Sequence, residues 1–100
     1  MPPHVAKYII SIKPSAEKEL DRLPDVVFAR IDVKILTLAD NPRPSGCKKL
    51  KGHADLWRIR IGDYRVVYAI NDVAARVEVL AVGWSALADV APAVIQVAIS

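Results

Sequence analysis

The sequence predicts an α+β fold in which two N-terminal helices pack on a small, mostly antiparallel sheet, in the order β-α-α-β-β-β. Three observations support this prediction. Segments with strand-like alternation lie near both ends of the chain, apolar residues recur at helical spacing between them, and a two-residue Gly62-Asp63 connection joins two alternating runs. At 100 residues the chain is long enough for one core but not for two.

The N-terminal half predicts one strand and two helices. Tyr8 to Lys13 is rich in β-branched residues that alternate with polar ones, which is typical of a strand. Ser15 is the expected N-cap of a first helix that reaches about Leu23. The residues that this helix is expected to bury are Ala16, Leu20 and Leu23. A second helix follows Pro24 and ends before the proline-rich segment 41–46. Its core-facing residues, at helical spacing, are Val27, Ile31, Ile35 and Leu38.

Gly62-Asp63 predicts a tight hairpin, because glycine adopts the positive φ that two-residue turns require. The register then pairs Arg60 with Arg65, and alternation gives the hairpin two distinct faces. The core face should carry Trp57, Ile59, Ile61, Tyr64, Val66 and Tyr68. The opposite face should carry Arg58, Arg60 and Arg65, and like charges directly opposite each other repel. Either water solvates these guanidinium groups or an anion lies between them.

The last expected strand runs from Arg76 to Val82, after a turn at Asn71-Asp72. Residues 1–83 are therefore expected to form one domain. The composition changes at Trp84: residues 84–100 contain no lysine or arginine and one acid, Asp89. A short helix over Ser85 to Val90 and an apolar extension are expected to pack on the sheet or on another chain, which makes self-association through this tail an open alternative. The tail is shorter than the usual length of a transmembrane helix, and no association with a membrane is expected.

Positive charge is concentrated between Arg43 and Arg65. This segment has seven lysines and arginines against two acids, whereas the other positions together carry a balance of −2 within the overall +3. One cationic face on a slightly acidic body is the electrostatic footprint of a protein that binds a polyanion, most commonly RNA or DNA.

The cysteine and histidine content excludes several kinds of site. Cys47 is the only cysteine, so no internal disulfide forms, which fits a reducing cytoplasm. An incidental loop thiol is the favoured interpretation of Cys47, because no histidine stands at a recognisable spacing from it. One cysteine with His4 and His53 offers no zinc-ligand pattern, and neither metal nor cofactor is expected. No secretory signal is expected either, because no charged segment precedes an apolar one at the start.

The chain resembles the RelE/ParE toxin superfamily over about residues 5–83. The features that carry this resemblance are the element order, the proline after the second helix, the Lys-rich loop and the hairpin Trp57 to Tyr68. These are the toxins of bacterial and archaeal type II toxin–antitoxin systems. The resemblance implies a RelE-like fold, a cytoplasmic location, and a cognate antitoxin, the ribosome and messenger RNA as partners. In the RelE branch it implies metal-independent cleavage of messenger RNA in the ribosomal A site, in which the ribose 2′-hydroxyl attacks the adjacent phosphate.

The resemblance also implies roles for individual residues. Lys49 and Lys51 match the lysines of the family's loop and are expected to transfer protons or stabilise charge. Arg65 matches the arginine of the hairpin and is expected to bind the pentacovalent phosphate of the transition state. The other cationic residues expected to bind RNA are Arg43, Lys48, His53, Arg58 and Arg60.

One departure from the RelE pattern keeps alternatives open. RelE-like toxins usually continue after the last strand into a basic segment with an arginine and a tyrosine that assist catalysis, and neither residue follows Gly83 here. The departure implies weakened ribonuclease activity. It also leaves open a ParE-like inhibitor of DNA gyrase without enzymatic activity, or an inactive relative that only binds an antitoxin.

Overall fold

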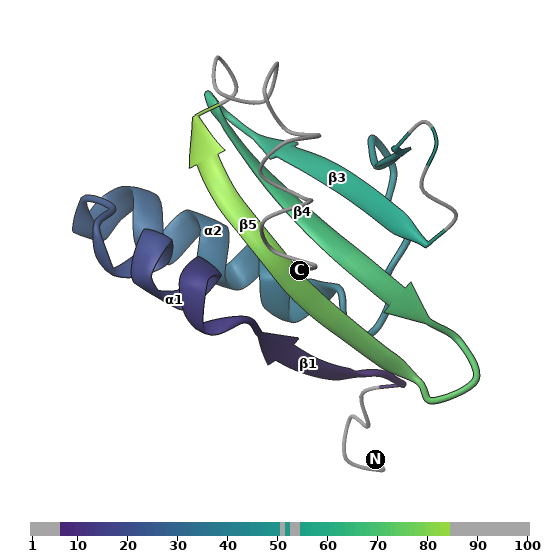
Figure 1. Cartoon of the computed structure of the whole chain (residues 1–100). Coiled ribbons are helices and arrows are strands. Elements are labelled where there is room, and N and C mark those ends of the chain that lie inside the picture. Colours follow the sequence, from purple (N-terminus) through teal and green to yellow (C-terminus); the bar gives the residue numbers. More distant parts are fainter. Residues whose placement is uncertain (1–6, 51, 53–54, 85–100) are drawn as a thin grey trace, which may run out of the picture.

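The computed structural model describes residues 7–50, 52 and 55–84, which form two helices on one face of a five-stranded sheet (Figure 1). The elements are β1 (Ile9–Ile12), α1 (Pro14–Asp21), α2 (Asp25–Thr37), β2 (Lys48–Lys49), β3 (Leu56–Ile61), β4 (Tyr64–Asn71) and β5 (Arg76–Trp84). The strand order is β1-β5-β4-β3-β2, and only the β1–β5 pair is parallel. The predicted α+β class and the mostly antiparallel sheet are confirmed. The two-residue strand β2 is an addition, because the sequence predicts only a loop there.

Helix α1 begins two residues earlier than the sequence predicts. Its N-cap is Lys13 in an extended conformation, with no side-chain cap, so the prediction of Ser15 as the N-cap is wrong. Pro14 occupies the first helical position, where its fixed φ fits and its missing N–H costs nothing. Ala16 and Leu20 are buried as expected, whereas Leu23 lies beyond the helix and is partly buried against the core.

Helix α2 follows the sequence prediction closely. Ile31, Ile35 and the C-cap residue Leu38 are almost fully buried, and Val27 is partly buried beside them. These side chains meet the predicted core face of the hairpin in one apolar cluster. From the sheet, that cluster contains Ile59, Val66, Tyr68, Ile70, Val77, Val79 and Val82, with Trp57, Ile61 and Tyr64 packed at its margin.

The hairpin has the predicted register. Ile61 pairs with Tyr64 across the Gly62-Asp63 turn, Gly62 has a φ of 60°, and Arg60 lies directly opposite Arg65. The predicted pairs Ile59–Val66 and Trp57–Tyr68 form as well. A two-residue turn fixes the register, and the register fixes which side chains enter the core.

A β-bulge interrupts the β4–β5 pair. Val67 pairs with Ala81 and Tyr68 with Val79, so Leu80 is the additional residue on β5. Leu80 and Ala81 join a second, smaller apolar cluster with Leu56 and Val67, separate from the main core. The bulge therefore lets Tyr68 and Val79 stay in the core while the sheet keeps apolar residues on its other face.

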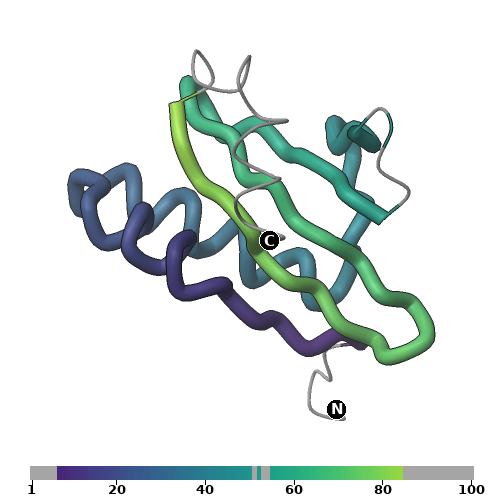
Figure 2. Tube along the Cα trace, in the orientation of Figure 1, coloured from purple at the N-terminus to yellow at the C-terminus, as the bar shows by residue number. Residues whose placement is uncertain are grey.

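Strand β5 lies in the interior of the sheet, between β1 and β4, and Figure 2 shows β1 running alongside it. Its pairing with β1 ends at Val79, five residues before β5 itself ends. Beyond that point the half-buried carboxylate of Glu19 on α1 accepts a hydrogen bond of 3.1 Å from the Val82 N–H. Partial burial raises the pKa of Glu19 above its ordinary value, and the hydrogen bond from Val82 opposes this shift.

Candidate nucleic-acid interface

Three arginines lie together on the sheet face opposite the helices, which we call the arginine face. Strand alternation directs Arg58 and Arg60 of β3 away from the core, and the register places Arg65 of β4 directly opposite Arg60. Arg60 is exposed, whereas Arg58 and Arg65 are half-buried. The structure thus groups the three arginines that the sequence predicts to share a face.

The charges of these arginines are not neutralised by the part of the chain that the structure describes. No carboxylate there forms an ion pair with Arg58, Arg60 or Arg65. The pKa of Arg58 is lowered, first by partial burial and then by the positive charges of Arg65 and Arg60. The Nε atom of Arg65 is buried and has no hydrogen-bond partner among the described residues. Since like charges repel and a buried donor without a partner costs free energy, this arrangement favours an anion at the arginine face.

The two lysines of β2 are divided between the faces of the sheet. Lys48 pairs with Arg58 and therefore lies on the arginine face, whereas Lys49 pairs with Trp57 and lies on the helix side at the sheet edge. Both are exposed. The structure consequently does not bring Lys49 together with Arg65. Lys51 and His53 lie outside the described residues, as do the expected helix Ser85–Val90 and the rest of the apolar tail.

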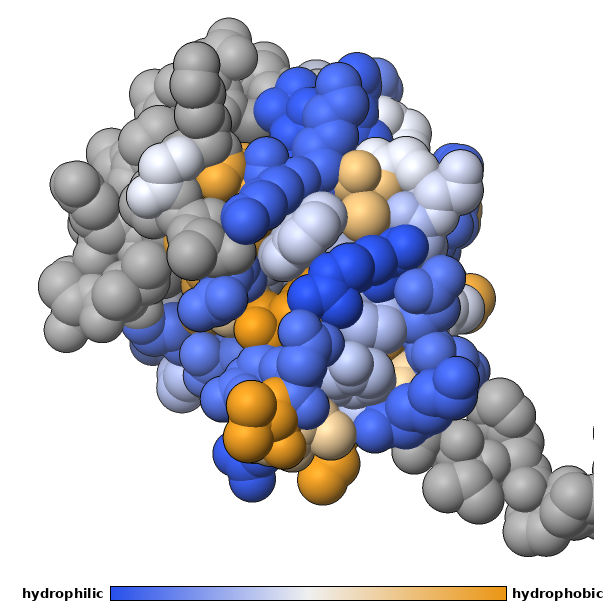
Figure 3. All heavy atoms as spheres, turned by 90° about the vertical axis from the view of Figure 1, so that its right-hand side faces the viewer, coloured by the Kyte–Doolittle hydropathy of each residue, from blue (hydrophilic) through white to orange (hydrophobic). Residues whose placement is uncertain are grey.

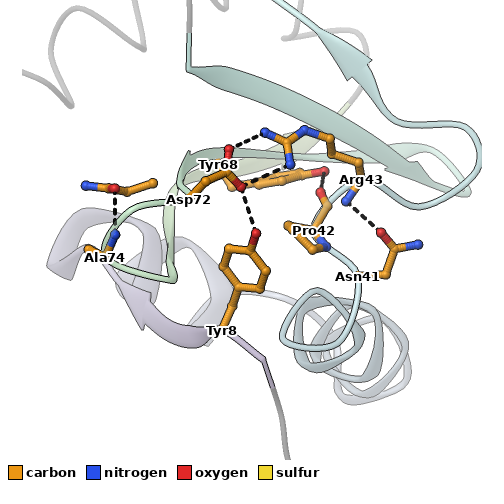
Figure 4. A network of polar contacts seen from close by, with 8 residues as sticks. Tyr8, Asn41, Pro42, Arg43, Tyr68, Asp72 and Ala74 are labelled. Carbon is orange, nitrogen blue, oxygen red and sulfur yellow. Dashed lines mark hydrogen bonds and ion pairs between the residues drawn. The ribbon is translucent and has the colours of Figure 1, made fainter.

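Arg43 takes part in a separate network (Figure 4). Its guanidinium donates two hydrogen bonds, of 3.2 and 2.9 Å, to the carboxylate of Asp72 and stacks over the Trp57 ring at 5.2 Å. Tyr8 donates a third hydrogen bond, of 2.7 Å, to the same carboxylate. Arg43 is therefore held by an acid on the turn between β4 and β5, unlike the arginines of the arginine face. The sequence offers no local signal for this pair, because the partners are far apart along the chain.

The network continues into the core through Tyr68. The Tyr68 hydroxyl is fully buried and donates a 2.7 Å hydrogen bond to the Pro42 carbonyl. Burial, together with the neighbouring Cys47, raises the pKa of Tyr68 far above its ordinary value. Cys47 itself packs partly buried against the main core, consistent with a structural thiol.

The surface outside these clusters offers few further sites. The view onto the β2–β3 edge shows mostly hydrophilic side chains with small hydrophobic patches between them (Figure 3). An open pocket of about 600 Å³ lies at the end of the sheet away from the Gly62 turn, and its charged lining is Asp55, Asp72, Arg76 and Glu78. Among the described residues no three His, Cys, Asp or Glu side chains are grouped to hold a metal ion. Neither helix of the described chain is long and apolar enough to cross a membrane.

The Asp72 network predicts an acid-sensitive contribution to stability. Hydrogen bonds from Arg43 and then Tyr8 lower the pKa of Asp72 from its ordinary 3.8. A depressed carboxylate pKa stabilises the fold above the unfolded-state value, and this stabilisation is lost as the pH falls through the folded-state value. We therefore expect the free energy of unfolding to fall more steeply below pH 3.8 in the wild type than in Asp72→Asn.

Urea unfolding at a series of acidic pH values measures the difference between the two proteins. Asp63→Asn, an exposed aspartate on the other turn, is the control, and parallel curves for Asp72→Asn and the wild type would contradict the prediction.

A known family matches most of the chain. The family described as the ParE toxin of the type II toxin–antitoxin system parDE matches residues 10–86. Among curated proteins, the toxin RelE of Mycobacterium tuberculosis is 39% identical over 75 residues, which cover 73% of this chain and 76% of that protein. The putative toxin RelE1 of Methanocaldococcus jannaschii is 34% identical over 67 residues, covering 64% of this chain and 74% of that one.

Solved structures share the fold. A chain of the archaeal RelE–RelB complex from Pyrococcus horikoshii superposes with a TM-score of 0.71 at 30% identity, covering 78% of this chain and 94% of that chain. A mutant of the E. coli toxin RelE in its free state gives a TM-score of 0.74 at 26% identity, covering 92% and 97%. A chain of the toxin–antitoxin complex RelBE2 of Mycobacterium tuberculosis gives 0.70 at 27% identity, covering 80% and 99%.

Proposed function

Since the chain belongs to the ParE toxin family and is a RelE-like toxin of the RelE/ParE superfamily, we propose that it cleaves messenger RNA on the ribosome and so inhibits translation. The arginine face is the observation that supports this proposal. Three guanidinium groups without carboxylate partners in the described chain lie on the sheet face opposite α1 and α2. A phosphodiester is a ligand whose charge and geometry suit paired arginines.

The chemistry assigns separate tasks to the cationic residues. The 2′-hydroxyl attacks the adjacent phosphate, the bond to the 5′-oxygen breaks, and a 2′,3′-cyclic phosphate and a 5′-hydroxyl remain. Arg65 and the facing Arg60 bind the phosphate oxygens, on which negative charge develops in the transition state. Arg58 and Lys48, paired across β2 and β3, extend the contact along the RNA backbone.

The attack also requires proton transfer from the 2′-hydroxyl and to the leaving oxygen. Because Lys49 lies on the helix side of the sheet, we assign this task to Lys51 and limit Lys49 to binding at the edge. No arginine or tyrosine follows Gly83 as in RelE-like toxins, so the proposed activity is weaker than that of a complete RelE site.

The proposed regulator is a cognate antitoxin. Relatives from Pyrococcus horikoshii and Mycobacterium tuberculosis were solved as RelE–RelB and RelBE2 complexes. By this likeness we propose that the chain is held inactive in the cytoplasm by a RelB-like protein and acts when that protein is removed.

Primer extension tests the proposed activity. Translating ribosomes programmed with a defined messenger RNA are mixed with the purified chain, and the same RNA without ribosomes is the matched control. We expect cuts at A-site codons in the first reaction only. A supercoiling assay with DNA gyrase runs in parallel, because the family match carries the ParE name. Inhibited supercoiling without RNA cuts would contradict the proposal and support the gyrase alternative. If the chain neither cuts RNA nor inhibits supercoiling, the remaining alternative is an inactive relative that only binds an antitoxin.

A further inference from the structure

The solvent side of α2 carries an apolar stripe that the core does not use. Val26, Val33 and Leu36 are 73%, 61% and 57% exposed, and the exposed Ala29 lies between them. Their spacing of three, four and three residues places all four along one line of the helix. Ile31 and Ile35, which enter the core, lie on the opposite side. Helix α2 is therefore apolar on two faces, whereas a helix at the surface of a monomer is normally apolar on one.

The stripe has the spacing of a coiled-coil seam. Val26 and Val33 occupy the a positions of a heptad, and Ala29 and Leu36 occupy the d positions. Valine at both a positions and leucine at one of the two d positions resemble the combination that favours two parallel helices in a coiled coil. The seam covers less than two heptads, since α2 has 13 residues. An interface of this length buries less than the ~1,600 Å² of a standard protein–protein contact and should be weak.

Charged residues flank the seam with opposite signs on its two sides. Asp25 and Asp32 occupy the g positions, whereas Arg30 occupies an e position. Asp25 and Arg30 are exposed and Asp32 is half-buried, and none of them forms an ion pair within the described chain. In a parallel pair of helices each g residue lies next to the e residue five positions further along the partner helix. Asp25 of one copy would then face Arg30 of the other, and the two-fold symmetry would form this pair twice.

We propose that α2 is a self-association surface through which two copies of the chain pair in parallel along Val26, Ala29, Val33 and Leu36. An antiparallel pair is disfavoured, because it would place g beside g and e beside e, so that Asp25 and Asp32 would meet acids and Arg30 would meet Arg30. The stripe lies on α2, on the other side of the sheet from the arginine face, so pairing through α2 does not use that face (Figure 1). This surface is distinct from the apolar tail, for which the sequence left self-association open.

Sedimentation equilibrium of the full-length chain over a range of concentrations tests the association. We expect a reversible monomer–dimer equilibrium that Val33→Glu weakens by at least about tenfold in Kd, because each dimer would place two carboxylates in the apolar seam. Val33 is exposed and glutamate is the better helix former, so the variant should fold. Val73→Glu, at a fully exposed valine in the turn between β4 and β5, is the matched control and should leave Kd unchanged.

A charge exchange tests the register. Asp25→Arg or Arg30→Asp alone should raise Kd, because each puts like charges on both symmetric pairs, whereas the double variant should restore the wild-type value. Cysteine cross-linking tests the direction. In a Cys47→Ser background, Val26→Cys and Val33→Cys should each form a disulfide dimer, because only parallel helices bring both positions against themselves.

The proposal is overturned by a chain that is monomeric at all concentrations, by a double charge variant no better than the single ones, or by cross-links at fewer than both positions. If Val33→Glu leaves self-association unchanged but prevents binding of the antitoxin, the stripe belongs to the antitoxin and the assignment of a second copy is wrong.

Discussion

Replacing Arg65 by alanine is expected to lower the rate of ribosome-dependent RNA cleavage by about 10²–10³-fold, the usual effect of removing one donor that stabilises transition-state charge. Arg65 lies opposite Arg60 on the sheet face away from α1 and α2, and its Nε has no partner in the described chain. The substitution therefore removes no observed hydrogen bond or ion pair, and the unfolding free energy should change little. Quantitative primer extension at equal protein concentration measures the rate, and urea unfolding checks the fold.

Two further variants make the Arg65 prediction specific. Arg65→Lys retains the charge but not the planar fork of donors, so it should recover only part of the activity. Arg22→Ala, at the exposed C-cap of α1 on the helix side, is the matched control and should retain full activity. Asp63, on the adjacent turn, forms no ion pair with Arg65 in the described chain, so no acid there accounts for this arginine. Unchanged cleavage by Arg65→Ala would remove Arg65 from the proposed site.

Replacing Tyr68 by alanine should destabilise the fold by about 3–5 kcal/mol, the usual cost of removing a buried aromatic side chain. Tyr68 is fully buried where α2, β3, β4 and the segment after α2 meet. Tyr68→Phe keeps the ring but leaves the Pro42 carbonyl without its 2.7 Å hydrogen bond, so a smaller loss of about 1–3 kcal/mol is expected.

Urea unfolding measures both Tyr68 variants, and Tyr64→Phe is the matched control. Tyr64 lies on the same strand and packs edge-to-face on Trp84, but its hydroxyl forms no hydrogen bond within the described chain. Its removal should change the unfolding free energy little. Equal effects of Tyr68→Phe and Tyr64→Phe would show that the bond to Pro42 contributes nothing to stability.

Local chemistry explains which parts of the fold the sequence could predict. The hairpin register follows from a two-residue turn with glycine, and alternation from that point separates the core residues from Arg58, Arg60 and Arg65. Helix α2 is predictable because its buried residues recur at helical spacing. The start of α1 was predicted wrongly because Ser15 is a favourable N-cap in general, whereas Pro14 directly before it already fits the first helical turn.

The features that the sequence did not predict depend on contacts between distant segments. The pairing of β2 with β3 decides that Lys48 and Lys49 lie on opposite faces, and nothing local to the two lysines specifies that register. The ion pair between Arg43 and Asp72 likewise joins the segment after α2 to the turn between β4 and β5. A count of positive charge between Arg43 and Arg65 therefore overstates the cationic face, because one arginine is neutralised and one lysine lies on the other side.

The interior position of β5 has a consequence for the order of folding. Strand β5 is the last strand in the sequence, yet it lies between β1 and β4. Ile9 of β1 pairs with Arg76 of β5, so β1 has no strand partner until β5 is present. Contacts of such long sequence separation slow folding. During synthesis from the N-terminus, α1, α2 and the β3–β4 hairpin are complete before the strand that joins β1 to the rest of the sheet exists. The emerging chain thus exposes the apolar faces of its helices and hairpin until β5 has been synthesised, and only then can the sheet close.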